Sequence, residues 1–222
     1  RDGFLYKKEF KKGKSYGKLI KEETKAKKTG TLITWKPDLE VFTDIEIPLE
    51  YFEDSLKRQA IVNDGVTITL KYKTEEETVE RSYYYKNGSV DYINEINTGN
   101  KLSDVYMFQS EATGRDRADK PEYKVKMKAA FAFNNSESLI EYYHNSSWLE
   151  HGGSPEKAVK AAFVSAVDQY ISKNNKYQKN ESKVTAGDIF DSLILITSSY
   201  SGITSYENQT RRPSTTSSFR RP

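Results

Sequence analysis

The sequence predicts an α+β fold, in which strands and helices follow one another irregularly along a charge-rich chain of 222 residues. Segments with alternating apolar and polar residues are typical of half-buried strands, and segments with a helical apolar stripe lie between them. The 16 Tyr and 10 Phe supply enough volume for a hydrophobic core, which argues against a disordered chain. The hydrophobic fraction of 36% and the charged fraction of 30% indicate a soluble globular protein.

The first third of the chain predicts two strands, a helix and a third strand. The strands cover residues 3–10 and 30–38, with a lysine-rich loop after the first. Pro37 ends the second strand, because proline cannot continue a hydrogen-bonded ladder. The helix begins at Pro48 and ends at Asp64-Gly65. Residues 66–72 alternate strictly and predict the third strand.

The middle of the chain predicts strands at 79–85 and 102–111, with a short helix at 89–97 between them. Residues 122–133 give the clearest strand pattern. Its inward-facing residues are Tyr123, Val125, Met127, Ala129, Phe131 and Phe133, and its outward-facing residues are Lys124, Lys126 and Lys128. We expect residues 138–147 to pair with this strand as a hairpin across a turn at 134–136.

The last third predicts a long helix, a short helix at 185–193 and a buried strand that begins at Leu193. Ser154 is the expected cap of the long helix, and Pro155 fits its first turn. Its wide apolar face predicts packing on a sheet. The tail at 211–222 is low in hydrophobic residues, and we expect it to be poorly ordered.

Several classes of site are excluded or disfavoured. The absence of Cys excludes disulfides and thiolate metal sites and fits a reducing, cytoplasmic location. His144 and His151 do not have metal-ligand spacing, so no metal site is predicted. No segment approaches the roughly 18 apolar residues of a membrane helix. The chain starts with neither Met nor a signal peptide, and we interpret it as an internal segment.

Phosphate-binding signals are weak when the residues are considered alone. The phosphate-loop, dinucleotide and nucleophile-elbow motifs are absent. Gly152-Gly153 precedes a helix, where free backbone N–H groups can hold an anion, but such a pair more often forms only a turn. Residues 1–36 hold twelve Lys or Arg against four Asp or Glu, and residues 206–222 hold four Arg against one Glu. Such basic regions favour nucleic acid or phosphate partners, or simply a solvated surface.

Seven short motifs in order point to one family: "RDGFLYKKEFKKG", "KKTGTLITWKPDLEVF", "LKRQAIVNDGVTITL", "YYYKNGSVDYINEIN", "LEHGGSPEKAVKAAFVSAVDQY", "TAGDIFDSLILITSS" and "YENQT". Together they resemble the ATPase subunit of type IIA DNA topoisomerases, the bacterial group of gyrase B and topoisomerase IV B (ParE). The resemblance covers about residues 1–211. Each motif alone is weak, and their shared order and spacing make coincidence improbable.

The resemblance implies a division of the chain. Residues 1–80 would be the C-terminal part of a GHKL (Bergerat) ATPase domain. Residues 81–205 would be a transducer domain with the ribosomal protein S5 domain 2-like fold, which is known for a left-handed βαβ crossover, an exception to the usual hand. Residues 206–222 would be a phosphate-sensing loop and tail.

The resemblance also implies a role for the "ENQT" loop. In the family, a Gln-Thr-Lys loop reaches from the transducer into the ATP site, where its Gln and Lys contact the γ-phosphate. Gln209 and Arg211 stand at those positions and are the catalytic and ATP-binding candidates. Arg211 departs from the family's lysine. It keeps the positive charge but has a flat, forked head, so its support of hydrolysis stays open.

Two further nucleotide contacts are implied. Thr31 matches a threonine that helps to bind adenine through water, and Arg1 matches an arginine at the mouth of the nucleotide pocket. This chain also departs from the family where relatives commonly have Gly-Gly-Thr-His, since it has Ser154 and Pro155. Tyr200 replaces a lysine that is often found in the strand before the loop.

The family's Glu/Asn helix, Asp-x-Gly-x-Gly motif and glycine-rich lid would lie upstream of Arg1, and its TOPRIM motifs downstream of Pro222. The cofactors would therefore be ATP and Mg²⁺, held mainly by residues outside this chain, and we expect the chain alone not to hydrolyse ATP. The implied partners are double-stranded DNA, a GyrA- or ParC-like cleavage subunit and a second ATPase domain in a homodimer. Lys124, Lys126 and Lys128 would contact DNA phosphates without sequence preference.

Two other functions stay open at this point. One is a non-enzymatic nucleic-acid-binding module with the S5-like fold, which would bind duplex or RNA whether or not nucleotide is present. The other is another GHKL ATPase of the MutL or Hsp90 type. Whether an intact topoisomerase would act as gyrase or as topoisomerase IV depends on its partner, and the sequence does not decide it.

Overall fold

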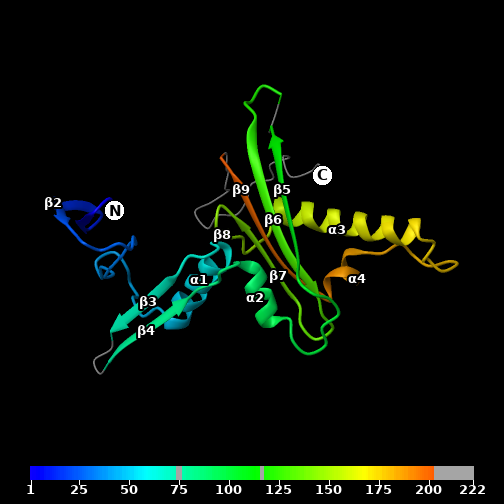
Figure 1. Ribbon diagram of the computed structural model, residues 1–222, viewed down its shortest axis with the longest axis horizontal. Coiled ribbons are helices and arrows are strands. Elements are labelled where there is room, and N and C mark those ends of the chain that lie inside the picture. The colour runs from blue at the N-terminus through cyan, green and yellow to red at the C-terminus, as the bar shows by residue number, and fades with distance from the viewer. Residues whose placement is uncertain (74–76, 116–117, 203–222) are drawn as a thin grey trace. The chain divides into compact units, whose positions relative to one another are not determined.

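The computed structural model describes residues 1–73, 77–115 and 118–202. The chain forms two compact units, the first from Arg1 to Leu49 and the second from Glu50 onward. Figure 1 shows the helices and strands of each unit along the chain. The predicted boundary at residues 80–81 lies inside the second unit and stays a prediction.

The first unit contains one antiparallel hairpin. Strand β1 (Phe4–Lys11) pairs with β2 (Lys14–Glu23) across a two-residue turn. Both turn residues have left-handed backbone, with φ of 50° at Lys12 and 73° at Gly13, as a two-residue hairpin turn requires. The expectation of a lysine-rich loop after β1 is therefore wrong, because most of that segment forms β2.

The predicted strand at 30–38 is also wrong. The described structure has no strand between residues 24 and 48, and the side chains of Leu32 and Ile33 are 84% and 78% exposed. A strand needs a neighbour to satisfy its backbone N–H and C=O groups. Within the described residues no strand pairs with this segment, so its apolar alternation does not produce a ladder.

The second unit begins with a helix, a hairpin and another helix. Helix α1 (Leu49–Val62) confirms the predicted helix and begins one residue after Pro48. Strand β3 (Ile68–Lys73) pairs with β4 (Thr78–Tyr83) in an antiparallel hairpin. Helix α2 (Ser89–Ile96) follows the Asn87-Gly88 turn and confirms the predicted short helix.

The rest of the second unit is a five-stranded sheet with the order β5-β6-β9-β7-β8. Its strands are β5 (Tyr106–Gly114), β6 (Tyr123–Phe133), β7 (Leu139–His144), β8 (Ser147–Trp148) and β9 (Leu193–Ser201). Strands β7 and β9 are parallel, and the other neighbours are antiparallel. Helices α3 (Ser154–Lys173) and α4 (Ala186–Phe190) connect β8 to β9.

The predicted hairpin between residues 122–133 and 138–147 is wrong, because β9 lies between β6 and β7. The seven residues from Leu193 to Ser199 are all buried. A strand that is apolar on both faces is best placed at the centre of a sheet that is covered on both sides. Asn134 is fully buried, and its side-chain oxygen accepts hydrogen bonds from the backbone of Ser136 and Glu137, which turns the chain away from β6.

Each face of the sheet has its own hydrophobic core, as alternation along the strands requires. One core joins α1 and α2 to the sheet and contains Ile61, Val62, Ile93, Ala130, Ala132, Tyr143, Ile194 and Ile196. The other joins α3 and α4 to the opposite face and contains Ala129, Tyr142, Leu149, Val159, Ile189, Phe190, Leu193 and Leu195. The predicted packing of the long helix on a sheet is thus confirmed (Figure 1).

The cap of α3 differs from the expected one. Gly153, with φ of 78°, is the N-cap, and Ser154 is already helical. A Cβ on Gly152 would overlap the Glu156 carboxylate, so only glycine fits where that side chain folds back. The glycine pair therefore starts the helix one residue earlier than a Ser cap would.

Candidate functional site

The two predicted nucleotide contacts of the first unit lie in open surroundings. Arg1 is exposed, its guanidinium lies 3.6 Å from the Asp2 carboxylate, and the terminal amine donates to the Phe4 carbonyl at 2.7 Å. Thr31 is exposed in the irregular segment next to Leu32 and Ile33. The described residues around Thr31 thus do not form the enclosed setting that an adenine would need.

Gln209 and Arg211 lie outside the described residues. The structure describes the strand that precedes them, since β9 runs through the centre of the sheet and ends at Ser201. Tyr200, the last large side chain of this strand, stands nine residues before Gln209. The anchor of the predicted sensing loop is therefore a central strand.

The three lysines of β6 lie on one face of the strand, as predicted, and this is the face that α1 and α2 cover further along. Two of them form ion pairs. The Nζ of Lys126 lies 2.7 Å from Glu111 on β5, and the Nζ of Lys128 lies 2.7 Å from Asp64 after α1. Lys124 lies opposite Thr113 in the β5–β6 register. A DNA phosphate would have to compete with a carboxylate for two of the three cations.

The ion pair on β5 has an electrostatic consequence. The hydrogen bond from Lys126, together with its charge, lowers the pKa of the Glu111 carboxyl below its usual range. Glu111 therefore stays ionised and keeps Lys126 in place at neutral pH. Both side chains are more than half exposed, so the pair contributes little to stability.

A second polar cluster joins α1 to the edge of the sheet that β7 and β8 form. Arg58 Nε donates to Glu141 at 3.3 Å, and the Arg58 guanidinium lies 4.1 Å from the Trp148 ring centre. The hydroxyl of Tyr143 donates to the other Glu141 oxygen at 2.6 Å. Burial, with the nearby Glu141 charge, raises the pKa of the Tyr143 phenol. The cluster therefore holds a buried carboxylate between two donors, which is a structural role.

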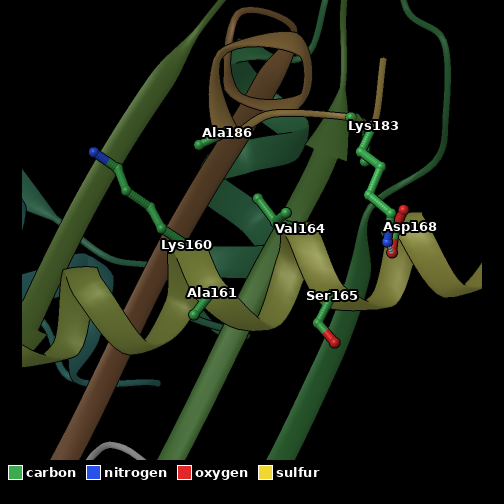
Figure 2. A pocket seen from close by; sticks show the side chains of 8 residues that line it. Lys160, Ala161, Val164, Ser165, Asp168, Lys183 and Ala186 are labelled. Carbon is green, nitrogen blue, oxygen red and sulfur yellow. Dashed lines mark hydrogen bonds and ion pairs between the residues drawn. The ribbon is translucent and has the colours of Figure 1, made fainter. Parts of the chain in front are cut away.

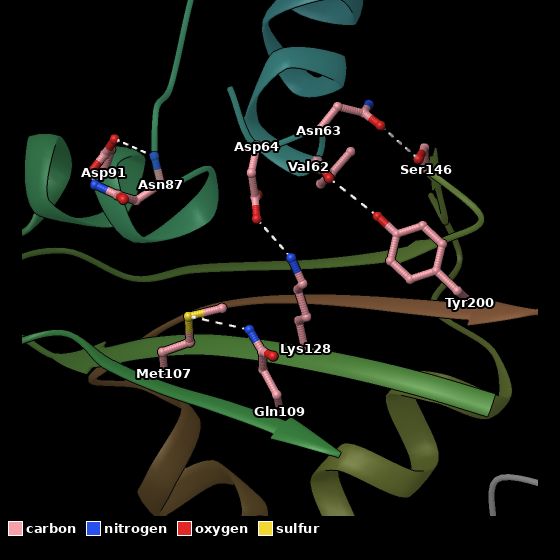
Figure 3. Close-up of polar contacts among 10 residues, drawn as sticks. All are labelled: Val62, Asn63, Asp64, Asn87, Asp91, Met107, Gln109, Lys128, Ser146 and Tyr200. Carbon is pink, nitrogen blue, oxygen red and sulfur yellow. Dashed lines mark hydrogen bonds and ion pairs between the residues drawn. The ribbon is translucent and has the colours of Figure 1, made fainter. Parts of the chain in front are cut away.

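Figure 3 shows the contacts at the C-terminal end of α1. The hydroxyl of Tyr200 donates to the Val62 carbonyl at 3.2 Å, and Lys128 donates to Asp64. The hydroxyl of Ser146 donates to the Asn63 side chain at 3.1 Å. Three different parts of the sheet, on β6, β9 and the β7–β8 turn, thus contact the same helix end.

His144 lies at the end of β7 and is 7% exposed. Its Nδ1 is 2.8 Å from the hydroxyl of Ser199 on the neighbouring β9, and Ser199 donates to the Tyr143 carbonyl at 3.1 Å. Burial lowers the pKa of the His144 imidazole, so it is neutral at pH 7. In the part of the chain that the structure describes, no three His, Asp or Glu side chains gather as metal ligands would.

An open pocket of about 490 Å³ lies between α3 and residues 183–186 (Figure 2). Alkyl groups of Ala161, Val164, Val184 and Ala186 line most of it, and Lys183 pairs with Asp168 at 3.2 Å. The hydroxyl of Tyr177 also donates to Asp168, which fixes the loop after α3. None of the predicted site residues that the structure describes lines this pocket. None of the described helices is both long and apolar enough to cross a membrane.

Sequence reasoning did not find the junction at the end of α1. The residues that meet there are far apart in the sequence: 64 positions separate Asp64 from Lys128, and 138 separate Val62 from Tyr200. No local spacing therefore reveals these contacts. The one available signal was Tyr200 itself, where the family often has a lysine.

The sequence and the fold are similar to those of known proteins. A family model described as "DNA gyrase B" matches residues 88–221, which is more than half of the chain. The DNA topoisomerase 4 B subunit of Staphylococcus aureus strain Mu50 is 27% identical over 202 residues, which are 89% of this chain and 29% of that protein. The same protein of strain MW2 has the same identity and coverage. The chain therefore spans less than a third of the length of these curated relatives.

Two solved structures share the fold. The 43K ATPase domain of Thermus thermophilus gyrase B, in complex with an aminocoumarin, aligns with a TM-score of 0.64 at 20% identity, over 99% of this chain and 59% of that one. The topoisomerase IV ATP-binding domain of Francisella tularensis aligns with a TM-score of 0.63 at 21% identity, over 96% and 55%. These likenesses confirm the predicted α+β fold class and are consistent with its GHKL part. The division from a transducer domain stays a prediction.

Proposed function

The chain belongs to the DNA gyrase B family, and from this premise we propose that it is part of the ATP-binding subunit of a type IIA DNA topoisomerase. In that subunit it would couple ATP binding and hydrolysis to DNA strand passage. The family match over residues 88–221 carries the proposal, because it includes both the five-stranded sheet and the "YENQT" segment after β9. It favours a topoisomerase over a MutL- or Hsp90-like ATPase.

The proposed division of labour follows the order of the chain. Residues 1–80 would complete the ATPase domain, residues 81–205 would form the transducer, and residues 206–222 would hold the sensing loop and tail. Because Thr31 and Arg1 are exposed here, the nucleotide would be enclosed only when the remainder of the subunit covers the first unit. Bound ATP with Mg²⁺ would supply the phosphoryl group that the loop senses.

In this proposal the two loop residues act on the terminal phosphate. Gln209 can donate a side-chain amide N–H to a phosphate oxygen, and Arg211 can donate two N–H groups from its fork. Preorganised donors of this kind stabilise charge that develops on a phosphoryl group. The loop would report the loss of that group to β9, and so to the sheet.

ATP turnover by the full subunit tests these roles. We expect Arg211→Ala to lower turnover by about 100-fold, as removal of one charge-stabilising donor does. Arg211→Lys restores the family's residue and should keep most of the activity. Gln209→Ala should also lower turnover, with its main effect on kcat. If all three variants hydrolysed ATP as fast as the wild type, Gln209 and Arg211 would not belong to the site.

The chain alone should not hydrolyse ATP, because the family's general base and Mg²⁺ ligands belong to the proposed remainder of the subunit. Phosphate release by the purified chain with Mg²⁺ and ATP is therefore expected to equal that of a blank. Hydrolysis above the blank that Arg211→Ala abolishes would contradict this assignment.

We propose that double-stranded DNA is the partner of the β6 lysines, with a GyrA- or ParC-like cleavage subunit and a second ATPase domain completing the enzyme. DNA contacts by lysine depend on salt, and each lost phosphate contact lowers the slope of log K against log salt by about 1. Exchange of Lys124, Lys126 and Lys128 for Ala should therefore lower the slope by up to about 3. An unchanged slope would remove these lysines from the DNA surface.

A further inference from the structure

Helix α1 is attached to the five-stranded sheet at its C-terminal half. Ala60, Ile61 and Val62 are 0%, 1% and 6% exposed, and Ile61 and Val62 pack against apolar residues of the sheet. Polar contacts from β6, β7, β9 and the β7–β8 turn surround this apolar contact. The helix end is therefore held by both packing and directed hydrogen bonds.

The bond from Tyr200 satisfies a group that a helix leaves unpaired. The last four C=O groups of an α-helix have no partner within the helix, and Val62 is the last residue of α1. The Tyr200 hydroxyl donates to that carbonyl at 3.2 Å (Figure 3). Tyr200 lies next to Lys126 in the β6–β9 register, so the contact comes from the central strand of the sheet.

Lys128 and Asp64 form the second contact. Their ion pair of 2.7 Å joins β6 to the residue two positions after α1, and the two side chains are 39% and 38% exposed. Gly88 lies close to the Asp64 carboxylate oxygen that does not pair with Lys128. A Cβ on Gly88 would overlap an Asp64 carboxylate oxygen, so the chain before α2 directly adjoins the pair.

The turn between β7 and β8 forms the third contact. The side-chain amide of Gln59 donates to the Ser146 carbonyl at 2.7 Å, and the Ser146 hydroxyl donates to Asn63 at 3.1 Å. Ser146 has a left-handed backbone with φ of 60°, which a serine adopts only at a cost. Ser146 thus meets α1 with both its carbonyl and its hydroxyl.

We propose that α1 and the five-stranded sheet move as one body, and that Tyr200 is the positioning residue that holds the end of α1 on the central strand β9. Tyr200 lies on β9, and the nine residues from it to Gln209 span at most about 30 Å. In the proposed function, a movement that the loop passes to β9 would reach α1 through the hydrogen bond from Tyr200 to Val62. This inference rests on the proposed function for its loop, while the attachment of α1 rests on the contacts above.

Hydrogen exchange on the 222-residue chain tests the attachment directly. Tyr200→Phe removes one hydroxyl and keeps the ring. Loss of one hydrogen bond corresponds to about a fivefold change in a local opening equilibrium. We expect the amides of residues 59–65 to exchange about fivefold faster in Tyr200→Phe. The amides of β6 and of the first half of β9 should keep their rates.

Tyr106→Phe is the matched control. Tyr106 lies on β5 of the same sheet, is 55% exposed, and its hydroxyl makes no hydrogen bond among the described residues. Exchange in this variant should equal that of the wild type throughout. Faster exchange over the whole sheet in Tyr200→Phe would indicate general destabilisation and would overturn the specific role of Tyr200, as would unchanged exchange at residues 59–65.

The coupling role requires the full subunit with its cleavage partner. We expect Tyr200→Phe to leave the KM for ATP within about twofold, because the Tyr200 hydroxyl donates to the Val62 carbonyl. We expect it to lower strand passage per ATP hydrolysed by about fivefold. An active enzyme whose coupling is unaffected by Tyr200→Phe would overturn this inference alone. A full subunit without ATP-dependent strand passage would overturn the proposed function, and with it the coupling role.

Discussion

Two segments of this chain have similar apolar composition, but one is exposed and the other is buried. In the first unit, "TLITW" at residues 31–35 carries Leu32 and Ile33 with exposures of 84% and 78%. In the second unit, "LILIT" at residues 193–197 carries Leu195 and Ile196 with exposures of 0% and 1%. Local propensity for strand is high in both.

The difference lies in what surrounds each segment. Strand β9 has β6 and β7 as neighbours and a layer of helices on each face. Residues 31–35 have no strand neighbour among the described residues. A short apolar run therefore becomes a strand only when other segments pair with it, and the first unit would gain such cover in the proposed full subunit.

The largest expected effect sharpens this comparison by removing alkyl groups from each segment. Leu195→Ala should lower the free energy of unfolding of the second unit by about 3 kcal/mol, because it opens a cavity in a filled core. Ile33→Ala should change unfolding by less than about 0.5 kcal/mol. Urea unfolding followed by tryptophan fluorescence measures both, because Trp35 reports the first unit and Trp148 the second. A cost for Ile33→Ala similar to that of Leu195→Ala would mean that residue 33 is buried in solution.

A smaller difference between two variants is expected at the junction that holds α1. Gly88 and Gly65 both have left-handed backbone, with φ of 56° and 74°, but only Gly88 is crowded by Asp64 and the Ile61 carbonyl. We expect Gly65→Ala to cost about 1 kcal/mol for its backbone alone, and Gly88→Ala about 3 kcal/mol. The difference between the two variants in the free energy of unfolding, measured by heat or urea, gives the cost of the crowding at Gly88. Equal costs would show that the junction is loosely packed.

The smallest effect concerns pH. Because burial lowers the pKa of His144, the unfolded chain binds a proton at this position more readily than the folded chain does. The stability that neutral His144 contributes is present above its unfolded pKa of about 6.5 and is lost as the pH falls below it. As the pH falls from about 7.5 to 5.5, the free energy of unfolding of the wild type should decrease by up to about 1.4 kcal/mol more than that of the His144→Gln variant. Equal losses would show that His144 is hydrated.

Much of the second unit could be predicted from its sequence because the signals are local. The alternation around Lys124, Lys126 and Lys128 predicts both β6 and its two faces, and Pro48 predicts the start of α1. Local signals do not place β9 between β6 and β7. Its position could be predicted only by comparing the expected burial of the strands, and the long apolar run from Leu193 marks β9 as a buried one. The strand β2 was missed because its lysines resemble a loop, although Lys12-Gly13 is a hairpin turn.

The candidate site could be predicted only in part. The resemblance supplied Gln209, Arg211, Thr31 and Arg1, and their roles stay predictions. The contacts that the fold creates between distant residues, such as Tyr200 with Val62 and Lys128 with Asp64, had no sequence signal. Lys126 and Lys128 were predicted to contact only DNA, but each is paired with a carboxylate. The prediction missed these pairs because alternation predicts the face on which a side chain lies and not its partner.

The central claim is that this chain links nucleotide to DNA topology, and the linking number of a closed plasmid tests it most directly. The full subunit with its cleavage partner should change the linking number when ATP and Mg²⁺ are present and should turn over many plasmids. Without nucleotide, or with Arg211→Ala, the change should be nearly lost. A change in linking number of equal extent with and without ATP, or none under any condition, would contradict the account.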